Sequence, residues 1–149
     1  MTLRFTFRFN KSIVERKMWR LKDELLDEIG NKLLDRVKEE IRFQLLRGRV
    51  PPLAPSTILR KGHDLILLDT WTMYHSYTKK LYYPSPNSVS IGIWIPDVAT
   101  YASVHEYGTE RAGRYHNIRI PPRPVLRYIF GNRLILTSLF QQAIRKVSI

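Results

Sequence analysis

The stretch KSIVERKMWRLKDELLDEIGNKLLDRVKEEIRFQLLRGRV, residues 11–50, decides the fold. Its apolar residues recur every three or four positions, which places them on one face of a helix. Ser12 and Glu15 form a capping-box pattern at the start, and Gly48 stands where a helix usually ends. The sequence therefore predicts one long amphipathic helix. Its apolar stripe consists of Val14, Met18, Leu21, Leu25, Ile29, Leu33, Val37, Ile41 and Leu45.

This helix is long for the size of the chain. At 1.5 Å per residue it would extend about 50 Å, whereas a compact chain of 149 residues has a radius of gyration of about 15 Å. We therefore expect the helix to project from the body or to bend, with Gly30-Asn31 as the natural position of a bend. After Ile29 the stripe repeats every four residues and drifts around the helix. Such a stripe suits a curved sheet or a neighbouring subunit.

Shorter elements flank the helix. Residues 3–9 alternate apolar and polar side chains and predict a strand with Leu3, Phe5, Phe7 and Phe9 on one face. The segments 76–83 and 88–95 predict a hairpin across PSPN. Residues 97–108 predict a short helix that Gly108 ends. We also expect a helical turn after the prolines of 51–55 and a short helix within 64–76, capped by Asp69 or Thr70. A brief strand is expected at 118–120. A further helix is expected within 125–146, with Gly131 as a candidate interruption.

Composition narrows the class of protein. The length suits a single domain, residues 1–149, and 44% hydrophobic residues argue against global disorder. No apolar run approaches the roughly 20 residues of a membrane span, and the first residues lack a signal-like core. We therefore expect neither membrane insertion nor secretion. The chain has no cysteine, which excludes disulfides and thiolate metal sites.

The charge is strongly basic and uneven. Lys and Arg number 25 against 13 acidic residues, a net charge of +12. From Arg111 to Ile149 there are eight basic residues, seven of them Arg, and no acidic one. Such a field attracts nucleic acid or an acidic protein face, and Arg favours fork-like pairing with carboxylates or phosphates. A plain solvated basic surface is the other interpretation.

The pair His105-Glu106 is the natural candidate for catalysis. A helical zinc-protease motif needs a second His four residues after the first, and that position is Thr109. The remaining histidines show no ligand spacing, and no nucleophile elbow or phosphate-binding glycine loop is present. We therefore expect no enzyme activity, no metal and no cofactor. His105 is interpreted as a hydrogen-bonded helix residue, partly buried against the sheet.

The residues after Gly108 interleave basic and aromatic side chains. This pattern is typical of stacking surfaces for nucleic acid, but no recognition helix, zinc finger or RNA-binding sheet accompanies it. A solvated loop and a protein docking element are the alternatives. The prolines that follow form a rigid corner that would hold Arg123 at a defined angle. The candidate assembly interface is Arg111, Arg114, Tyr115, Arg119 and Arg123.

Three segments, taken in order, resemble one family. They are PPLAPSTILRKG (51–62), YASVHEYGT (101–109) and IPPRPVL (120–126). Together they are similar to three elements of the bacteriophage virion-morphogenesis proteins, also called tail-completion or tail-to-head joining proteins. The first resembles a segment of proline, Ser/Thr and basic residues. The second resembles the element His/Val-Glu-Phe/Tyr-Gly-Thr, and the third resembles Ile/Met-Pro-Ala-Arg-Pro-Phe-Leu. The chain departs from the last element at Pro122 and Val125.

This resemblance implies a non-enzymatic α+β subunit, with a long N-terminal helix and shorter helices packed on a mainly antiparallel sheet. It implies a ring of copies, a hexamer being one size, at the head-proximal end or neck of a phage or prophage tail, assembled in the host cytoplasm. The expected partners are tail-tube or tail-terminator and head-connector proteins, with non-specific contact to DNA in the channel, and neither a membrane nor a small-molecule substrate. Residues 109–119 would form a projecting basic arm. The structural motif residues would be His105, Glu106, Tyr107, Gly108, Thr109, Pro121 and Pro124.

Two other functions remain open from the residues alone. One is a non-catalytic basic nucleic-acid-binding module. The other is a metal-dependent hydrolase that uses His105 and Glu106. A ring needs two complementary faces on each subunit, and the acidic and basic stretch from Asp23 to Glu40 is a candidate to meet the Arg-rich C-terminal third of a neighbour.

Overall fold

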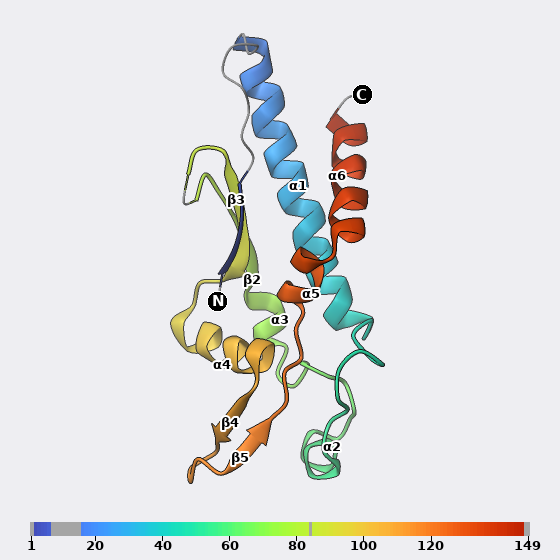
Figure 1. Ribbon diagram of the computed structural model, residues 1–149, viewed down its shortest axis with the longest axis vertical. Helices are drawn as coiled ribbons and strands as arrows, with labels where there is room; N and C mark the ends of the chain where they lie inside the picture. The colour runs from blue at the N-terminus through green and yellow to red at the C-terminus, as the bar shows by residue number, and fades with distance from the viewer. Residues whose placement is uncertain (1, 7–15, 84, 148–149) are drawn as a thin grey trace.

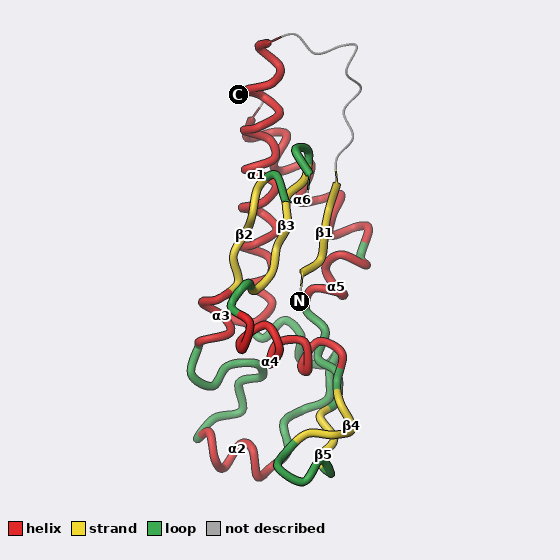
Figure 2. Tube along the Cα trace, turned by 90° about the vertical axis from the view of Figure 1, so that its left-hand side faces the viewer, coloured by secondary structure: helices red, strands yellow, loops and turns green. Residues whose placement is uncertain are grey.

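The long helix α1 (Arg16–Arg42) forms the axis of an elongated molecule (Figure 1). The computed structural model describes residues 2–6, 16–83 and 85–147, with side chains from Arg20 onward. A three-stranded sheet covers one side of α1, and helix α6 (Arg133–Val147) lies along the other (Figures 1 and 2). The α+β architecture expected from the sequence is confirmed.

The apolar stripe of α1 is buried over its middle part. Ile29, Leu33, Val37 and Ile41 are at most 2% exposed, and burying each such side chain stabilises the fold by about 1.5–3 kcal/mol. The helix runs through Gly30 without interruption, and its first turns extend beyond the sheet (Figure 1). The predicted projection therefore describes this helix better than the predicted bend.

The ends of the predicted stripe were wrong. The helix ends at Arg42, before Gly48, because Gln44 adopts a positive φ of 55° and reverses the chain. Leu45 is consequently 43% exposed, and Leu46 takes the buried position. Leu21, near the other end, is 50% exposed. The predicted capping pair Ser12 and Glu15 and the stripe residue Val14 lie outside the described residues, as does the side chain of Met18.

Gly30 allows α1 to approach the sheet closely. A Cβ at this position would lie 2.8 Å from Cγ2 of Val89 and 3.1 Å from Cδ of Lys79. The ammonium group of Lys79 fixes the same contact, since it lies 2.6 Å from Oδ1 of Asp27 and 2.6 Å from Oδ1 of Asn31. The glycine expected to bend the helix thus serves helix–sheet packing.

The main sheet is antiparallel with the strand order β1-β3-β2. Strand β1 (Thr2–Thr6) and strand β2 (Tyr77–Leu81) flank β3 (Ser88–Ile93). The predicted hairpin is confirmed, and so is the N-terminal strand as far as Thr6, while Phe7 and Phe9 lie outside the described residues. Every residue of β3 is buried, including the two serines that alternate with its apolar residues. Their hydroxyls are satisfied by backbone carbonyls, as in Ser90 Oγ to Tyr83 O at 2.7 Å. Ile95, the last residue of the predicted strand segment 88–95, lies beyond the end of β3 and is 54% exposed.

The other half of the molecule carries the shorter elements. Helices α2 (Pro55–Lys61), α3 (Thr72–Ser76) and α4 (Pro96–Tyr107) lie near a second antiparallel hairpin, β4 (Thr109–Ala112) and β5 (Ile118–Ile120) (Figure 1). The three helices and β5 follow the predicted segments, whereas β4 lies in the region 109–119 that was expected only as an arm. The predicted cap of α3 was wrong. Trp71 precedes this helix with a positive φ of 64°, and no side chain caps it.

The C-terminal helix is interrupted where the sequence predicted. Helix α5 (Leu126–Gly131) ends at Gly131, and α6 follows. Oδ1 of Asn132 accepts hydrogen bonds from the backbone N–H groups of Leu134 (3.1 Å) and Ile135 (3.2 Å). The asparagine therefore caps α6, which explains why a new helix starts within one residue.

Candidate functional site

Glu106, in the last turn of α4, is a buried carboxylate with a structural task. Its side chain is 3% exposed. Oε2 accepts hydrogen bonds from the N–H groups of Val125 (2.9 Å) and Leu126 (3.3 Å), and Oε1 accepts one from Arg127 (2.6 Å). These are the orphan donors at the start of α5, where negative charge is favourable. The carboxylate thus ties the end of α4 to the start of α5.

Gly108 fits this connection through its conformation. It has a φ of 75° and a ψ of 172°, a region that is essentially restricted to glycine. A Cβ would lie 2.9 Å from the carbonyl oxygen of Ile120 and 2.9 Å from Cδ of Pro122. The glycine was predicted to end the helix, and it does. It also admits the returning proline corner.

Arg123 lies inside this connection and differs from the other predicted interface residues. It is 6% exposed. Its guanidinium donates to the carbonyl oxygens of Pro51 (3.3 Å, from Nε) and Pro52 (3.2 Å, from Nη2). Its backbone N–H donates to the carbonyl oxygen of His105 at 2.6 Å. The rigid proline corner therefore directs Arg123 inward, where it joins segments about 70 residues apart in sequence.

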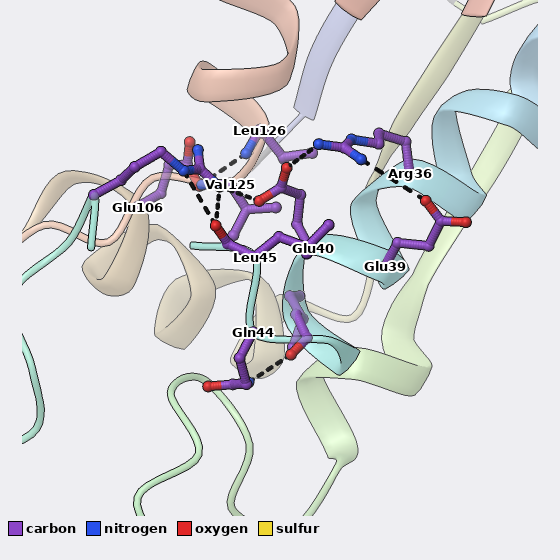
Figure 3. A network of polar contacts seen from close by, with 10 residues as sticks. Arg36, Glu39, Glu40, Gln44, Leu45, Glu106, Val125 and Leu126 are labelled. Carbon is purple, nitrogen blue, oxygen red and sulfur yellow. Dashed lines mark hydrogen bonds and ion pairs between the residues drawn. The ribbon is translucent and has the colours of Figure 1, made fainter. Parts of the chain in front are cut away.

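The three segments 51–62, 101–109 and 120–126 consequently meet in one place. We call this place the joint, defined by Glu106, Gly108 and Arg123 with their hydrogen-bond partners. A second buried carboxylate supports it from α1. Glu40 is 1% exposed and pairs with Arg36 at 2.5 Å and with Arg49. Figure 3 shows Arg36 between Glu39 and Glu40, with Glu106, Val125 and Leu126 nearby. The guanidinium of Arg49 stacks on the ring of Tyr128, in α5, at 3.5 Å.

The β4–β5 hairpin projects from the joint (Figure 1). Most of its side chains are exposed, with Tyr115 at 78% and Ile118 at 54%, while Thr109, Ala112 and Ile120 are half-buried. Arg119 forms an ion pair with Glu110 at 3.0 Å, and both side chains are 72% exposed. We call residues 109–120 the arm. It brings together four of the five predicted interface residues: Arg111, Arg114, Tyr115 and Arg119.

Neither a protein-family model, nor a curated protein, nor a solved structure matches this chain. The interpretation of the site therefore depends on its geometry. Among the described residues, no group of three or more His, Asp or Glu side chains is arranged to hold a metal ion. Within the same residues, no helix is both long and apolar enough to cross a bilayer.

His105 occupies an unusual environment for an imidazole. The prediction of a hydrogen-bonded ring was wrong, because both ring nitrogens are buried and find no hydrogen-bond partner among the described residues. The ring packs edge-on against Tyr101, with 4.5 Å between ring centres. Burial, together with the positive charges of Arg123 and Lys61, lowers the pKa of His105 to about 4. The imidazole is therefore neutral at pH 7.

This low pKa predicts an acid-sensitive fold. Between pH 6.5 and 4 the unfolded chain binds a proton at His105 that the folded chain does not, so the stability from this residue is lost as pH falls. We expect a loss of about 2 kcal/mol by pH 4, after discounting for partial exposure. Urea denaturation at pH 7 and pH 4 measures it. The difference between wild type and His105→Gln isolates His105 from the carboxylates, and an equal acid loss in both proteins would contradict the prediction.

A cavity of about 440 Å³ adjoins His105, between α2, α4 and β5. Its wall carries the basic residues Arg60, Lys61, Arg119 and Arg123, but a single acidic residue, Asp69. The sequence analysis missed this cavity, because Lys61 and His105 are 44 positions apart and neither belongs to a recognised ligand motif. The available signal was the pair of basic residues, Arg60 and Lys61, in the helical turn predicted after the prolines of 51–55.

The acidic residues of α1 are mostly used within the chain. Asp27 pairs with Lys79 at 2.6 Å and Glu28 with Lys146 at 2.8 Å, while Glu40 is enclosed by two arginines. In the described part of the chain, the exposed carboxylates Glu24 and Asp35 have no ion-pair partner. Glu39 is half-exposed and 3.9 Å from Arg36. Asp23 pairs with Lys22 at 3.6 Å. In the mixed acidic and basic stretch from Asp23 to Glu40, the carboxylates left for a partner are thus Glu24, Asp35 and Glu39.

Proposed function

We propose that this chain is a structural virion protein of a tailed phage or prophage. It completes the tail, or joins the tail to the head, through protein–protein contacts in a ring, and it works without catalysis. The observation that carries the proposal is the joint. Three separate segments resemble the tail-completion family, and in the folded chain all three contact one another through Glu106 and Arg123.

The joint gives the arm a rigid base. Glu106 and Gly108 fix the chain before the arm, and Arg123 fixes it afterwards. An exposed hairpin held at both ends loses little conformational entropy when it contacts a partner, which favours binding. Its exposed arginines suit carboxylates on a neighbouring subunit. Glu24, Asp35 and Glu39 on α1 are the candidate second face of a head-to-tail ring.

The exposed arginines and Tyr115 also support the alternative, a nucleic-acid-binding module. The two functions differ in their dependence on salt and concentration. A nucleic-acid module binds DNA as a monomer, with an affinity that falls steeply with salt. A ring protein self-associates as its concentration rises, whether or not DNA is present.

Electron microscopy of particles assembled without this chain tests the proposal. We expect filled heads and tails that remain separate, because the surface that joins them is missing. Adding the purified chain to such a mixture should restore joined particles. The variant Glu106→Gln, in which the joint is disrupted, is compared with the wild-type chain. It should restore few joined particles. Normally joined particles in the absence of the chain would contradict the proposal.

A further inference from the structure

The cavity beside His105 holds positive charge that the described residues do not neutralise. Asp69, the one acidic residue in its wall, pairs with Arg60 at 3.2 Å. Lys61 donates to the carbonyl oxygen of Leu65 at 2.7 Å, and Arg123 donates to the carbonyls of Pro51 and Pro52. Carbonyl oxygens satisfy donors, but they do not supply a compensating charge.

These charges act on one another. Burial lowers the pKa of Lys61, and nearby Arg60 and Arg123 lower it further, against a raising effect of Asp69. Burial is the main reason that the pKa of His105 is lowered, and the charges of Arg123 and Lys61 act in the same direction. Partly desolvated cations that repel one another gain much from an anion placed between them, because a low effective dielectric strengthens each attraction.

Apart from Ser56 and Thr57, the rest of the wall is mainly apolar. Leu53, Leu68, Ile118 and Ile120 line it beside the cationic groups, and the ring of Tyr101 completes it. A cavity of about 440 Å³ is within the range of small-ligand sites, which combine mainly apolar walls with a few placed polar groups. An anion that fits must therefore carry an apolar body.

We propose that this cavity binds a carboxylate group attached to an apolar body. Lys61 has three ammonium donors and uses one on Leu65, and Arg123 retains donors beyond the two that hold the proline carbonyls. Two donor groups match the two oxygens of one carboxylate, whereas a phosphate has more oxygens than this wall can satisfy. The carboxylate comes either from a free carboxylic acid or from an acidic side chain of a neighbouring protein. The proposal does not depend on the ring.

Binding also changes the state of His105. A negative charge beside Lys61 and Arg123 cancels part of the field that keeps the imidazole neutral, so the ligand favours protonation of His105. Affinity for an ionised carboxylate probe should consequently rise as pH falls from 7 to about 5.5. Lys61, Arg123 and Tyr101 are the titratable or charged groups that face His105 from α2, the proline corner and α4. His105→Gln should remove this pH dependence.

Titration of the full chain with 2-naphthoate, followed by two-dimensional NMR, tests the proposal. We expect a Kd on the order of 1 mM or tighter, with shifts at the amides of Lys61, Tyr101 and His105. Neutral 2-naphthamide should bind at least fivefold more weakly. Lys61→Gln should weaken naphthoate binding at least fivefold, while Arg145→Gln, at the far end of α6, should not change it (Figure 1). The pH series uses 2-naphthoate between pH 7 and about 5.5, where a carboxylic acid of ordinary pKa stays largely ionised.

Two outcomes would overturn the proposal. One is equal affinity for naphthoate and naphthamide, and the other is unchanged naphthoate affinity in Lys61→Gln. The wild-type NMR shifts stand independently of any effect of a variant on folding. Native mass spectrometry with saturating naphthoate then identifies the source. Dissociation of assembled copies assigns the site to a neighbour's acidic side chain, and unchanged assembly assigns it to a free acid. A chain that never assembles would contradict the proposed ring but leave the cavity site standing.

Discussion

Replacing Glu106 by glutamine is expected to lower the free energy of unfolding by about 3 kcal/mol. The carboxylate is 3% exposed and accepts three backbone N–H groups at the start of α5. Glutamine keeps one acceptor oxygen and turns an NH₂ group towards a donor. One buried N–H then has no partner, and the favourable charge at the helix N-terminus is lost. In a chain of this length the melting temperature should fall by about 6–12 °C.

Glu110→Gln is the matched control, since it makes the same chemical change on a carboxylate that is 72% exposed. Its effect should stay within about 0.5 kcal/mol. Thermal and urea denaturation of both variants measure the difference. A Glu106→Gln protein as stable as wild type would contradict the structural role, and the carboxylate would then again be a candidate for chemistry. A general acid or base is removed by this substitution without loss of the fold, so the two interpretations predict opposite stabilities.

The sequence predicted the helices and strands that depend on residues close to one another in the chain. Periodicity located α1 and the β2–β3 hairpin, and Gly108 and Gly131 marked the ends of two helices, because these signals depend on residues close together in the chain. The same reasoning failed at the C-terminal end of α1. There the positive φ of Gln44 exposes Leu45 and buries Leu46, which reverses the pattern that a continued helix would give.

The candidate site could be predicted only in part, because its contacts are non-local. The sequence predicted a structural part for Glu106 but could not reveal its partners, which lie about 20 positions further along the chain. Arg123 was grouped with the exposed arginines of the arm, since nothing in IPPRPVL reveals that the carbonyls of Pro51 and Pro52 will face it. Side-chain chemistry indicated which residues are candidates for the site. Which of these side chains face inward depends on the tertiary fold.

Reversing the charge of two arm residues is expected to abolish assembly while leaving the subunit folded. In Arg114→Glu with Arg119→Glu, both changes lie on exposed positions, so the fold should lose no more than about 1 kcal/mol. Carboxylates on a partner would then meet like charge, which costs several kcal/mol across an interface. We expect the assembled fraction in native mass spectrometry to fall at least tenfold at equal protein concentration.

The control for this double variant is Arg133→Glu with Arg145→Glu, which changes the net charge equally on exposed positions of α6. If the ring depends on the arm, this control assembles as wild type does, and only the arm variant fails. If net charge alone governs association, both variants change together. Assembly of the arm variant at wild-type level would contradict the arm as the interface.

A third double variant, Glu24→Lys with Asp35→Lys, tests the other face. Combined in a mixture with the arm variant, it should restore association between the two chains, because opposite charges again face each other.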